Sequence, residues 1–482
     1  MTISAHLPQL PLMLAGIARP AVELIRRAGI PTATLPHVAL SAGGAGRFVL
    51  YDSRSSTSST QARRAKNQGL ELIDLAAISD CLGPQGDPRS PSDRATQFMA
   101  AATAGQFLDK LKQEIEGRGG LWLRLADYPF PYQSAICVLV EHLSQELTDL
   151  PEIVAGFPGK VTHFVSSRLR ADQLALVAAA RLGEVGWVAD IDSLESSARK
   201  TQSHWATRLD RFRAAGLNVN GLISAEAHPA IPSPRSLMQL GLRYMCHPQS
   251  TASCHAERPF RCPPESAWIH FGIARPNTMA TEAGPADCEM PKAVVMDECV
   301  RTFLLRREQE LGHRLDAAHV LGPENDHPHF ATNIEPQEWM VEWVRGHYQA
   351  GNPLFIHETT SQIELVHELL CLTTNAARCS LMWQTTFSEF ARWWTARRQL
   401  NLQVWKRDEG YEIHASGNFD AFPWSVEIWR GQHVATLPIK QPTLNIRDDG
   451  IVFLKALNKG SAGFSAHQVS IQKDTLLAAA AR

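Results

Sequence analysis

Residues 172–194 read DQLALVAAARLGEVGWVADIDSL, and this stretch decides the fold. Its first half has apolar residues at helical spacing and stops at Gly183, a residue type that commonly ends helices. Its second half is a short apolar run that ends in Asp190 and Asp192, which predicts a buried strand with acidic residues at its carboxyl end. A helix followed closely by a buried strand is the repeating unit of a mostly parallel α/β sheet.

The same alternation continues on both sides of this stretch. We predict further strands over residues 134–142, 160–167, 217–225, 242–247, 353–360 and 380–386. We predict further helices over residues 196–215, 233–241 and 387–398. In the first of these helices Trp205, Leu209 and Phe212 recur at positions i, i+4 and i+7, so they share one face. The pattern indicates a parallel sheet, either open or closed into a barrel, with an insertion at about residues 247–350.

Two flanking regions differ from this central part. Residues 1–120 contain two strand-like runs, 47–54 and 70–78, around a helical segment, and we interpret them as an α/β unit of unknown role. Residues 401–460 switch to short strands of period two joined by turns, which predicts a small all-β domain. Residues 461–482 form a tail. The central domain is therefore expected to span residues 121–400.

Composition excludes some classes of partner. The chain has 482 residues and a formal net charge of −2, so it supplies no field that would attract nucleic acid. It has no uninterrupted apolar stretch of the length that crosses a bilayer, and we expect no membrane span. Its nine cysteines are scattered and odd in number, which favours reduced thiols and a cytoplasmic location.

Ionisable residues follow or interrupt five of the predicted strands. Ligands of parallel α/β sheets bind at the carboxyl ends of the strands, so this clustering predicts a pocket there. It does not identify a reaction. The candidates are Glu141, His142, His163, Asp190, Asp192, Glu226, His228 and His357.

The order of these segments over about residues 121–398 resembles the polysaccharide deacetylases of the NodB-homology group. The resemblance rests also on Gly186-Trp187, on Ala214-Ala215-Gly216 and on the tryptophan-rich helix near residue 393. It implies a distorted (β/α) barrel that removes N-acetyl groups from sugar polymers with a divalent metal, usually zinc. In that chemistry an aspartate and two histidines hold the metal, a carboxylate acts as base and a late histidine acts as acid.

The chain departs from the family pattern at most of these positions. Val188 and Asp192 stand where the resemblance places the two metal histidines. Glu141, His142 and Leu143 stand where it places the base and the metal aspartate, and the family proline after the fourth strand is replaced by Glu226. The late histidine, His357, is in place. Valine cannot bind a metal, and the loss of one ligand removes most zinc affinity, so no cofactor is expected.

Three functions follow from this pattern. The leading interpretation is a divergent deacetylase-like protein of carbohydrate metabolism that is catalytically degenerate and binds glycan or assists an active paralogue. Its substrate cleft would include Trp187, His142, Glu226 and His228. The second is an active hydrolase of C–N bonds, an N-acetyl sugar deacetylase with a rebuilt site. There His357 would be the acid and Glu141 or Asp192 the base, and Asp190 and Asp192 would be the candidates to hold Zn, Mg or Mn. The third is an assembly subunit without a ligand.

The tryptophans of the last helix and of the all-β domain are the remaining candidates for sugar contacts. Adjacent positions on a helix do not share a face, so we expect Trp393 and Trp394 to pack in the core. The same expectation holds for Trp424 and Trp429, although an exposed ring there could stack on a sugar.

Overall fold

The computed structural model forms two compact units. Unit 1 comprises residues 1–133, 349–351 and 393–482, and unit 2 comprises residues 134–348 and 352–392. The structure describes residues 7–35, 46–78, 106–142, 160–166, 168–180, 182–189, 198–223, 234–248, 269–273, 353–359, 382–419, 421–431 and 433–455.

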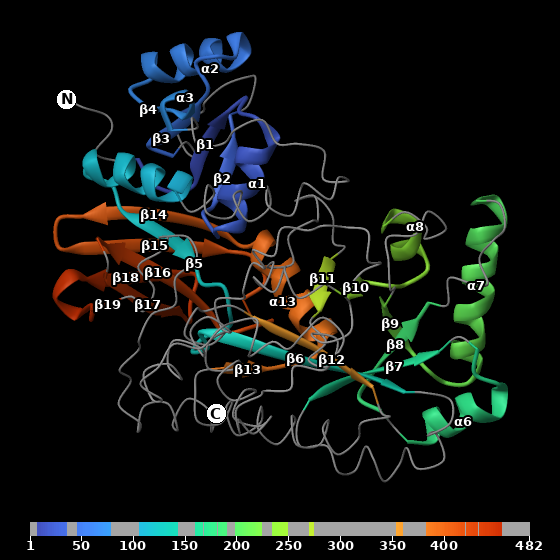
Figure 1. Cartoon of the computed structure of the whole chain (residues 1–482). Coiled ribbons are helices and arrows are strands. Elements are labelled where there is room, and N and C mark those ends of the chain that lie inside the picture. Colours follow the sequence, from blue (N-terminus) through green and yellow to red (C-terminus); the bar gives the residue numbers. More distant parts are fainter. Residues whose placement is uncertain are drawn as a thin grey trace, which may run out of the picture. The chain divides into compact units, whose positions relative to one another are not determined.

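Unit 2 is built on an eight-stranded parallel sheet (Figure 1). Along the sheet the strands follow the order β11-β10-β9-β8-β7-β6-β12, and β13 pairs with β6 beyond this path. The strands are β6 (Ser134–His142), β7 (Val161–Ser166), β8 (Glu184–Val188), β9 (Val219–Ile223), β10 (Tyr244–Pro248), β11 (Ile269–Ile273), β12 (Leu354–Thr359) and β13 (Met382–Gln384). The predicted parallel sheet is therefore confirmed.

Strand β6 is buried on both faces along most of its length. Residues 134–140 are all buried, and only Glu141 near the carboxyl end is half-exposed. A continuous apolar run of this kind is typical of a central parallel strand, which is covered on both sides. The two end strands of the path, β11 and β12, approach one another within 8 Å between Cα atoms. The sheet is therefore curled in the direction of a barrel.

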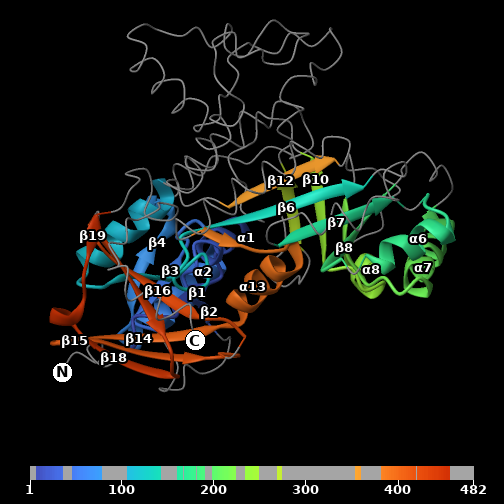
Figure 2. The same cartoon turned by 90° about the horizontal axis from the view of Figure 1, so that it is seen from below.

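Three helices connect successive strands of this sheet. They are α6 (Ala171–Ala179), α7 (Ala198–Ala214) and α8 (Pro234–Gln239), and they flank strands β7 to β10 (Figure 2). The predicted face of α7 is confirmed, because Trp205, Leu209 and Phe212 are at most 2% exposed. Gly216 follows α7 with a φ of 83°, a left-handed conformation that favours glycine and ends the helix.

Helix α13 (Phe387–Gln399) begins in unit 2 and ends in unit 1. Thr386 caps this helix, since the backbone N–H of Glu389 donates to Thr386 Oγ1 at 3.3 Å. The Glu389 carboxylate accepts a hydrogen bond from Thr385 Oγ1 at 2.8 Å and pairs with Lys160 at 2.6 Å. The start of the helix is thus fixed by side chains from two elements.

The N-terminal part of unit 1 is a four-stranded parallel sheet in the order β2-β1-β3-β4. Its elements are β1 (Leu12–Ala15), α1 (Arg19–Arg27), β2 (Thr32–Thr34), β3 (Phe48–Tyr51), α2 (Ser56–Asn67), β4 (Glu71–Asp74) and α3 (Leu75–Ile78). Met13 and Val49 from the sheet pack with Ala65 of α2 in one apolar cluster. The α/β character predicted for this region is confirmed.

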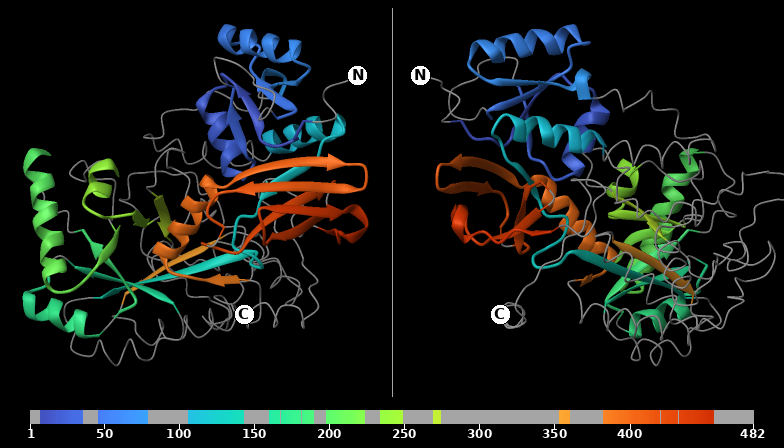
Figure 3. Two further views of the ribbon diagram at one scale, coloured as in Figure 1. Left: turned by 180° about the vertical axis from the view of Figure 1, so that it is seen from behind. Right: turned by 60° about the vertical axis from the view of Figure 1, so that its left-hand side comes forward.

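The C-terminal strands of unit 1 form antiparallel sheets, as predicted (Figure 3). One sheet has the order β14-β15-β18 and the other β19-β17-β16-β5. The strands are β5 (Trp122–Leu125), β14 (Asn401–Arg407), β15 (Gly410–Ser416), β16 (Trp424–Arg430), β17 (His433–Ile439), β18 (Thr443–Arg447) and β19 (Leu454–Lys455).

Strand β5 lies in a different place from the one the sequence suggests. Residues from 121 onward were expected to open the barrel, but β5 pairs antiparallel with β16 in unit 1. A buried ion pair joins the two strands, in which Arg124 Nε donates to Glu427 Oε2 at 2.7 Å. A short apolar run predicts a strand, but it does not say which sheet the strand joins.

No helix in the described part of the chain combines the length and the apolar character needed to span a bilayer.

Candidate functional site

The carboxyl edge of the parallel sheet in unit 2 is the place where the sequence predicts a pocket. The structure describes Glu141 and His142 at the end of β6, His163 in β7, and the backbone of His357 in β12. Four predicted residues, Asp190, Asp192, Glu226 and His228, lie outside the described residues. Their predicted roles as metal ligands or cleft residues stay predictions.

The structure brings the strands of Glu141 and His357 together. Strands β6 and β12 are parallel neighbours, with His357 opposite Leu139 and Thr359 opposite Glu141. The backbone positions of Glu141 and His357 are therefore two residues apart along adjacent strands, although they are far apart in sequence. This is the arrangement that a base and an acid on one substrate would need, but their catalytic roles stay predictions.

His142 and His163 form a buried pair on neighbouring strands. His142 Nε2 lies 2.8 Å from His163 Nδ1, and the rings stack with their centroids 5.0 Å apart. The two residues are 2% and 4% exposed. One nitrogen of this contact carries the proton and the other accepts the hydrogen bond, so at least one of the two rings is neutral. We call these two residues the imidazole pair.

Burial determines the charge state of the imidazole pair. It lowers the pKa of His142 to about 4, against an opposing effect of nearby Glu141. Burial, together with the nearby His142, lowers the pKa of His163 to about 3. Both rings are therefore neutral at neutral pH. The sequence shows both histidines, but their pairing depends on the register of β6 with β7, which sequence reasoning missed.

Trp187 and Val188 at the end of β8 point in opposite directions. Trp187 is 3% exposed and packs on helix α7, with its ring centroid 4.6 Å from that of Trp205 and 6.1 Å from that of Phe212. Successive strand residues alternate between faces, so half-buried Val188 projects from the face opposite α7. This packing accounts for Trp187 without a ligand, and its predicted contact with substrate stays a prediction.

The described residues do not fit the zinc site that the resemblance implies. They include no group of three His, Cys, Asp or Glu side chains that could hold a metal ion. Val188 has no donor atom, and one ring nitrogen of His142 already contacts His163. A neutral imidazole can ligate zinc, but a site needs several such donors around an accessible position.

A second buried polar cluster lies at the opposite, amino edge of the same sheet. Tyr244 Oη donates to Glu184 Oε1 at 2.5 Å, and the backbone N–H of Ser388 donates to the same carboxylate at 3.1 Å. Glu184 is 6% exposed. A buried carboxylate at the first turn of a helix satisfies backbone N–H groups that have no partner within the helix. This cluster therefore fixes α13 against β8 and β10.

No protein-family model matches this sequence, and neither does any curated protein. Similar solved structures include an inferred polysaccharide deacetylase from Mycobacterium smegmatis, 10% identical, with a TM-score of 0.33 and with 55% of this chain and 92% of that chain covered. A CE4 family pseudoenzyme from Bacillus anthracis is also 10% identical, with a TM-score of 0.28. The match covers 55% of this chain and 66% of that chain. A 4-alpha-glucanotransferase from Thermococcus litoralis is 14% identical, with a TM-score of 0.28. The match covers 54% of this chain and 40% of that chain. Likenesses at this level assign no family.

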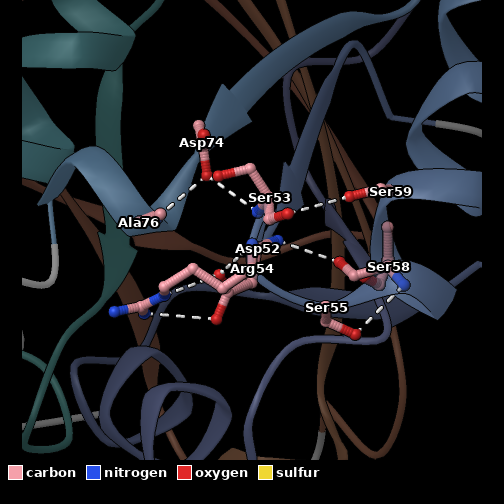
Figure 4. Close-up of polar contacts among 9 residues, drawn as sticks. Asp52, Ser53, Arg54, Ser55, Ser58, Ser59, Asp74 and Ala76 are labelled. Carbon is pink, nitrogen blue, oxygen red and sulfur yellow. Dashed lines mark hydrogen bonds and ion pairs between the residues drawn. The ribbon is translucent and has the colours of Figure 1, made fainter.

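The N-terminal sheet of unit 1 has its own polar turn at the carboxyl end of β3 (Figure 4). Asp52 accepts hydrogen bonds from the backbone and the guanidinium of Arg54, and Ser55 Oγ accepts from the backbone N–H of Ser58 at the start of α2. The Arg54 hydrogen bond holds the pKa of Asp52 below its usual value. Ser58 Oγ also donates to the Ala15 carbonyl at the end of β1. These bonds order the turn from β3 into α2.

The tryptophans expected to pack in the core do so. Trp393 and Trp394 are 1% and 3% exposed, and Trp424 and Trp429 are 2% and 1% exposed. Trp393 Nε1 donates to the Asp127 carbonyl at 2.9 Å, and its ring stacks on Trp424 at 4.6 Å between centroids. The prediction of core packing is confirmed for all four rings.

Proposed function

We propose that this chain is a divergent polysaccharide deacetylase-like protein of carbohydrate metabolism that binds glycan and has lost the metal-dependent reaction. One observation carries the proposal, namely the state of His142 at the end of β6. The resemblance places the base and the metal-binding aspartate after this strand, where the chain reads Glu141, His142 and Leu143, and the His142 imidazole is 2% exposed and bonded to His163. Val188 on β8 supports the same conclusion, because it replaces a ligand with a side chain that has no donor.

The physical reason is the number and charge of the donors. Zinc in a catalytic site takes three protein ligands and keeps one position open for water. The described carboxyl edge offers one half-buried carboxylate, Glu141, and a pair of neutral rings that satisfy each other. A cation bound beside Glu141 and the imidazole pair would lack charge compensation. We therefore propose no reaction step at a metal.

The glycan part of the proposal rests on the position of the site. Parallel α/β sheets bind their ligands at the carboxyl edge of the strands, and fold and reaction separate easily in evolution. A cleft that has lost its metal can still bind a sugar by hydrogen bonds. We propose Glu141 as one acceptor, because it is the half-exposed acidic residue at the end of β6.

The test combines binding and chemistry on the full chain. Isothermal titration with an acetylated chitooligosaccharide is expected to show binding that Glu141→Ala weakens. Acetate release from the same sugar is expected to stay at the level of buffer with added zinc, magnesium or manganese. If the chain binds no glycan and releases no acetate, the assembly-subunit function replaces this one.

One observation favours the second function, an active hydrolase of C–N bonds. Glu141 and His357 lie on adjacent parallel strands, as a base and an acid would. That function predicts acetate release that is lost in both Glu141→Gln and His357→Ala. Lys160→Ala, on the exposed start of β7, is a matched control that leaves such an activity unchanged.

A further inference from the structure

The outward face of the sheet β14-β15-β18 in unit 1 carries its side chains in two aligned rows. Leu402, Val404 and Ile413 are at most 1% exposed and define the inner face, so the residues between them project outward. The backbone register then aligns the outward residues across the three strands. The first row is Gln403, His414 and Thr443, and the second row is Trp405, Glu412 and Asn445.

Trp405 is the tryptophan of these C-terminal strands that is not buried. Trp424 and Trp429 are at most 2% exposed, whereas Trp405 is half-exposed. Its ring is held on two sides. The His414 ring meets it edge-on at 4.7 Å between centroids, and the Arg407 guanidinium lies 5.8 Å from its centroid. An aromatic ring held in place loses little conformational entropy when a ligand stacks on it.

The charges on this face offset one another. Arg407 donates to Glu412 Oε2 from Nε at 2.9 Å and from a terminal nitrogen at 2.5 Å. The other oxygen of Glu412 lies 2.7 Å from His414 Nε2. The Arg407 hydrogen bond keeps the pKa of Glu412 below its usual value, so this carboxylate stays ionised and paired. The remaining outward groups of the two rows are amides and a hydroxyl, which select no ion.

A cavity of about 470 Å³ reaches the first row at the end of the sheet where Asn401 and Ser416 lie. Gln403, His414 and Thr443 line it together with Ser416, and Thr32 of the edge strand β2 lines it from the side. This volume lies in the range of small-molecule sites, which combine an apolar surface with a few convergent polar groups. The row that contains Trp405 continues the same face.

We propose that the β14-β15-β18 face is a binding site for a neutral pyranose oligosaccharide. A pyranose ring has a flat C–H face that suits the half-exposed Trp405 ring, and its hydroxyls each donate and accept. The amides of Gln403 and Asn445 also donate and accept, so they match those hydroxyls. The site belongs to unit 1, and the proposal does not rest on the function proposed for unit 2.

The test uses the full chain and four neutral pentasaccharides, β-1,4-linked N-acetylglucosamine, glucose, xylose and mannose, in isothermal titration. We expect at least one to bind, with an affinity that added salt does not change, because no ion pair forms with the sugar. Trp405→Ala and Gln403→Ala are each expected to weaken binding about tenfold or more, which corresponds to about 1.4 kcal/mol. Trp405→Phe keeps an aromatic platform and is expected to retain most of the affinity.

Lys406→Ala is the matched control, because Lys406 is exposed and follows Trp405 on the other side of the strand. It is expected to bind like the parent chain, and circular dichroism checks that each variant is folded. Binding that is lost in Glu141→Ala but kept in Trp405→Ala and Gln403→Ala would overturn the proposal and support the cleft of unit 2. Failure of all four sugars to bind, or binding of anionic oligosaccharides alone, would also overturn it.

Discussion

His142 Nε2 lies 2.8 Å from His163 Nδ1, and both rings are buried between neighbouring parallel strands. The contact joins the end of β6 to the middle of β7 and needs an unprotonated nitrogen on one of the two rings. The imidazole pair therefore links the stability of the sheet to the protonation state of these two histidines.

Acid is expected to destabilise unit 2 through the imidazole pair. An unfolded histidine titrates near pH 6.5, whereas the folded pKa values are about 4 for His142 and about 3 for His163. Their contribution is complete above pH 6.5 and is lost as the pH falls toward 4, because the unfolded chain then binds more protons. Between pH 6.5 and about pH 5 each ring would contribute a loss of about 2 kcal/mol in the free energy of unfolding.

Urea unfolding at about pH 7.5 and about pH 5 measures this effect. His142→Gln is expected to remove about half of the pH dependence, and His433→Gln, which alters an exposed histidine of unit 1, is expected to leave it unchanged. An equal pH dependence in His142→Gln and the parent chain would show that the pair is not the cause.

Glu184→Gln is expected to destabilise unit 2. The buried carboxylate accepts from Tyr244 Oη and from the backbone N–H of Ser388, and a neutral amide replaces one of its acceptor oxygens with a donor. We expect a loss of about 2 kcal/mol in the free energy of unfolding. Asp210→Asn, which breaks the exposed pair of Asp210 with Arg213, is the control and should change stability by less than about 0.5 kcal/mol. Similar losses in the two variants would contradict the role of Glu184 in fixing α13.

Gly221→Ala tests the close approach of Tyr244 to strand β9. A Cβ at Gly221 would lie 2.1 Å from Tyr244 Cζ, so the ring or the strand would have to move. Overpacking of this kind costs about 1 to 3 kcal/mol. Gly183→Ala is the matched control, because a Cβ there meets nothing within 4 Å. Thermal unfolding of the two variants measures the difference, and equal melting temperatures would contradict the packing.

Glu427→Gln tests the buried ion network that holds β5 in unit 1. Arg124 is 1% exposed and binds both Glu427 and Asp127, so removal of one charge leaves the guanidinium partly uncompensated. We expect a loss of about 3 kcal/mol. Asp449→Asn removes an exposed partner of Arg447 at 3.5 Å and is expected to have almost no effect. Urea unfolding distinguishes them, and an unchanged midpoint in Glu427→Gln would refute the importance of the network.

The sequence predicted the elements of the fold better than their partners. The apolar run of β6 and the helical spacing of Trp205, Leu209 and Phe212 are local patterns, and the structure confirms them. The sheet that β5 joins depends on Arg124 and Glu427, which are 303 residues apart, so no local pattern could indicate it. The hydrophobic periodicity of a segment shows which face of its helix or strand is buried. It carries no information about which other strand lies beside it.

The candidate site was predictable to the same limited extent. The strand ends identified Glu141 and His357, and the register of β6 with β12 places their strands side by side. Both His142 and His163 were candidates, but their pairing was missed because it depends on the register of β6 with β7. The outward row around Trp405 was missed for a related reason, since a period-two pattern gives the exposed face of each strand but not the alignment between strands.

The most direct test of the central claim is metal content together with acetate release, measured on the purified full chain after incubation with zinc, magnesium or manganese. We expect far less than one metal ion per chain and no release of acetate from an acetylated chitooligosaccharide above the buffer level. One bound metal ion per chain, with acetate release that is lost in His357→Ala, would contradict it.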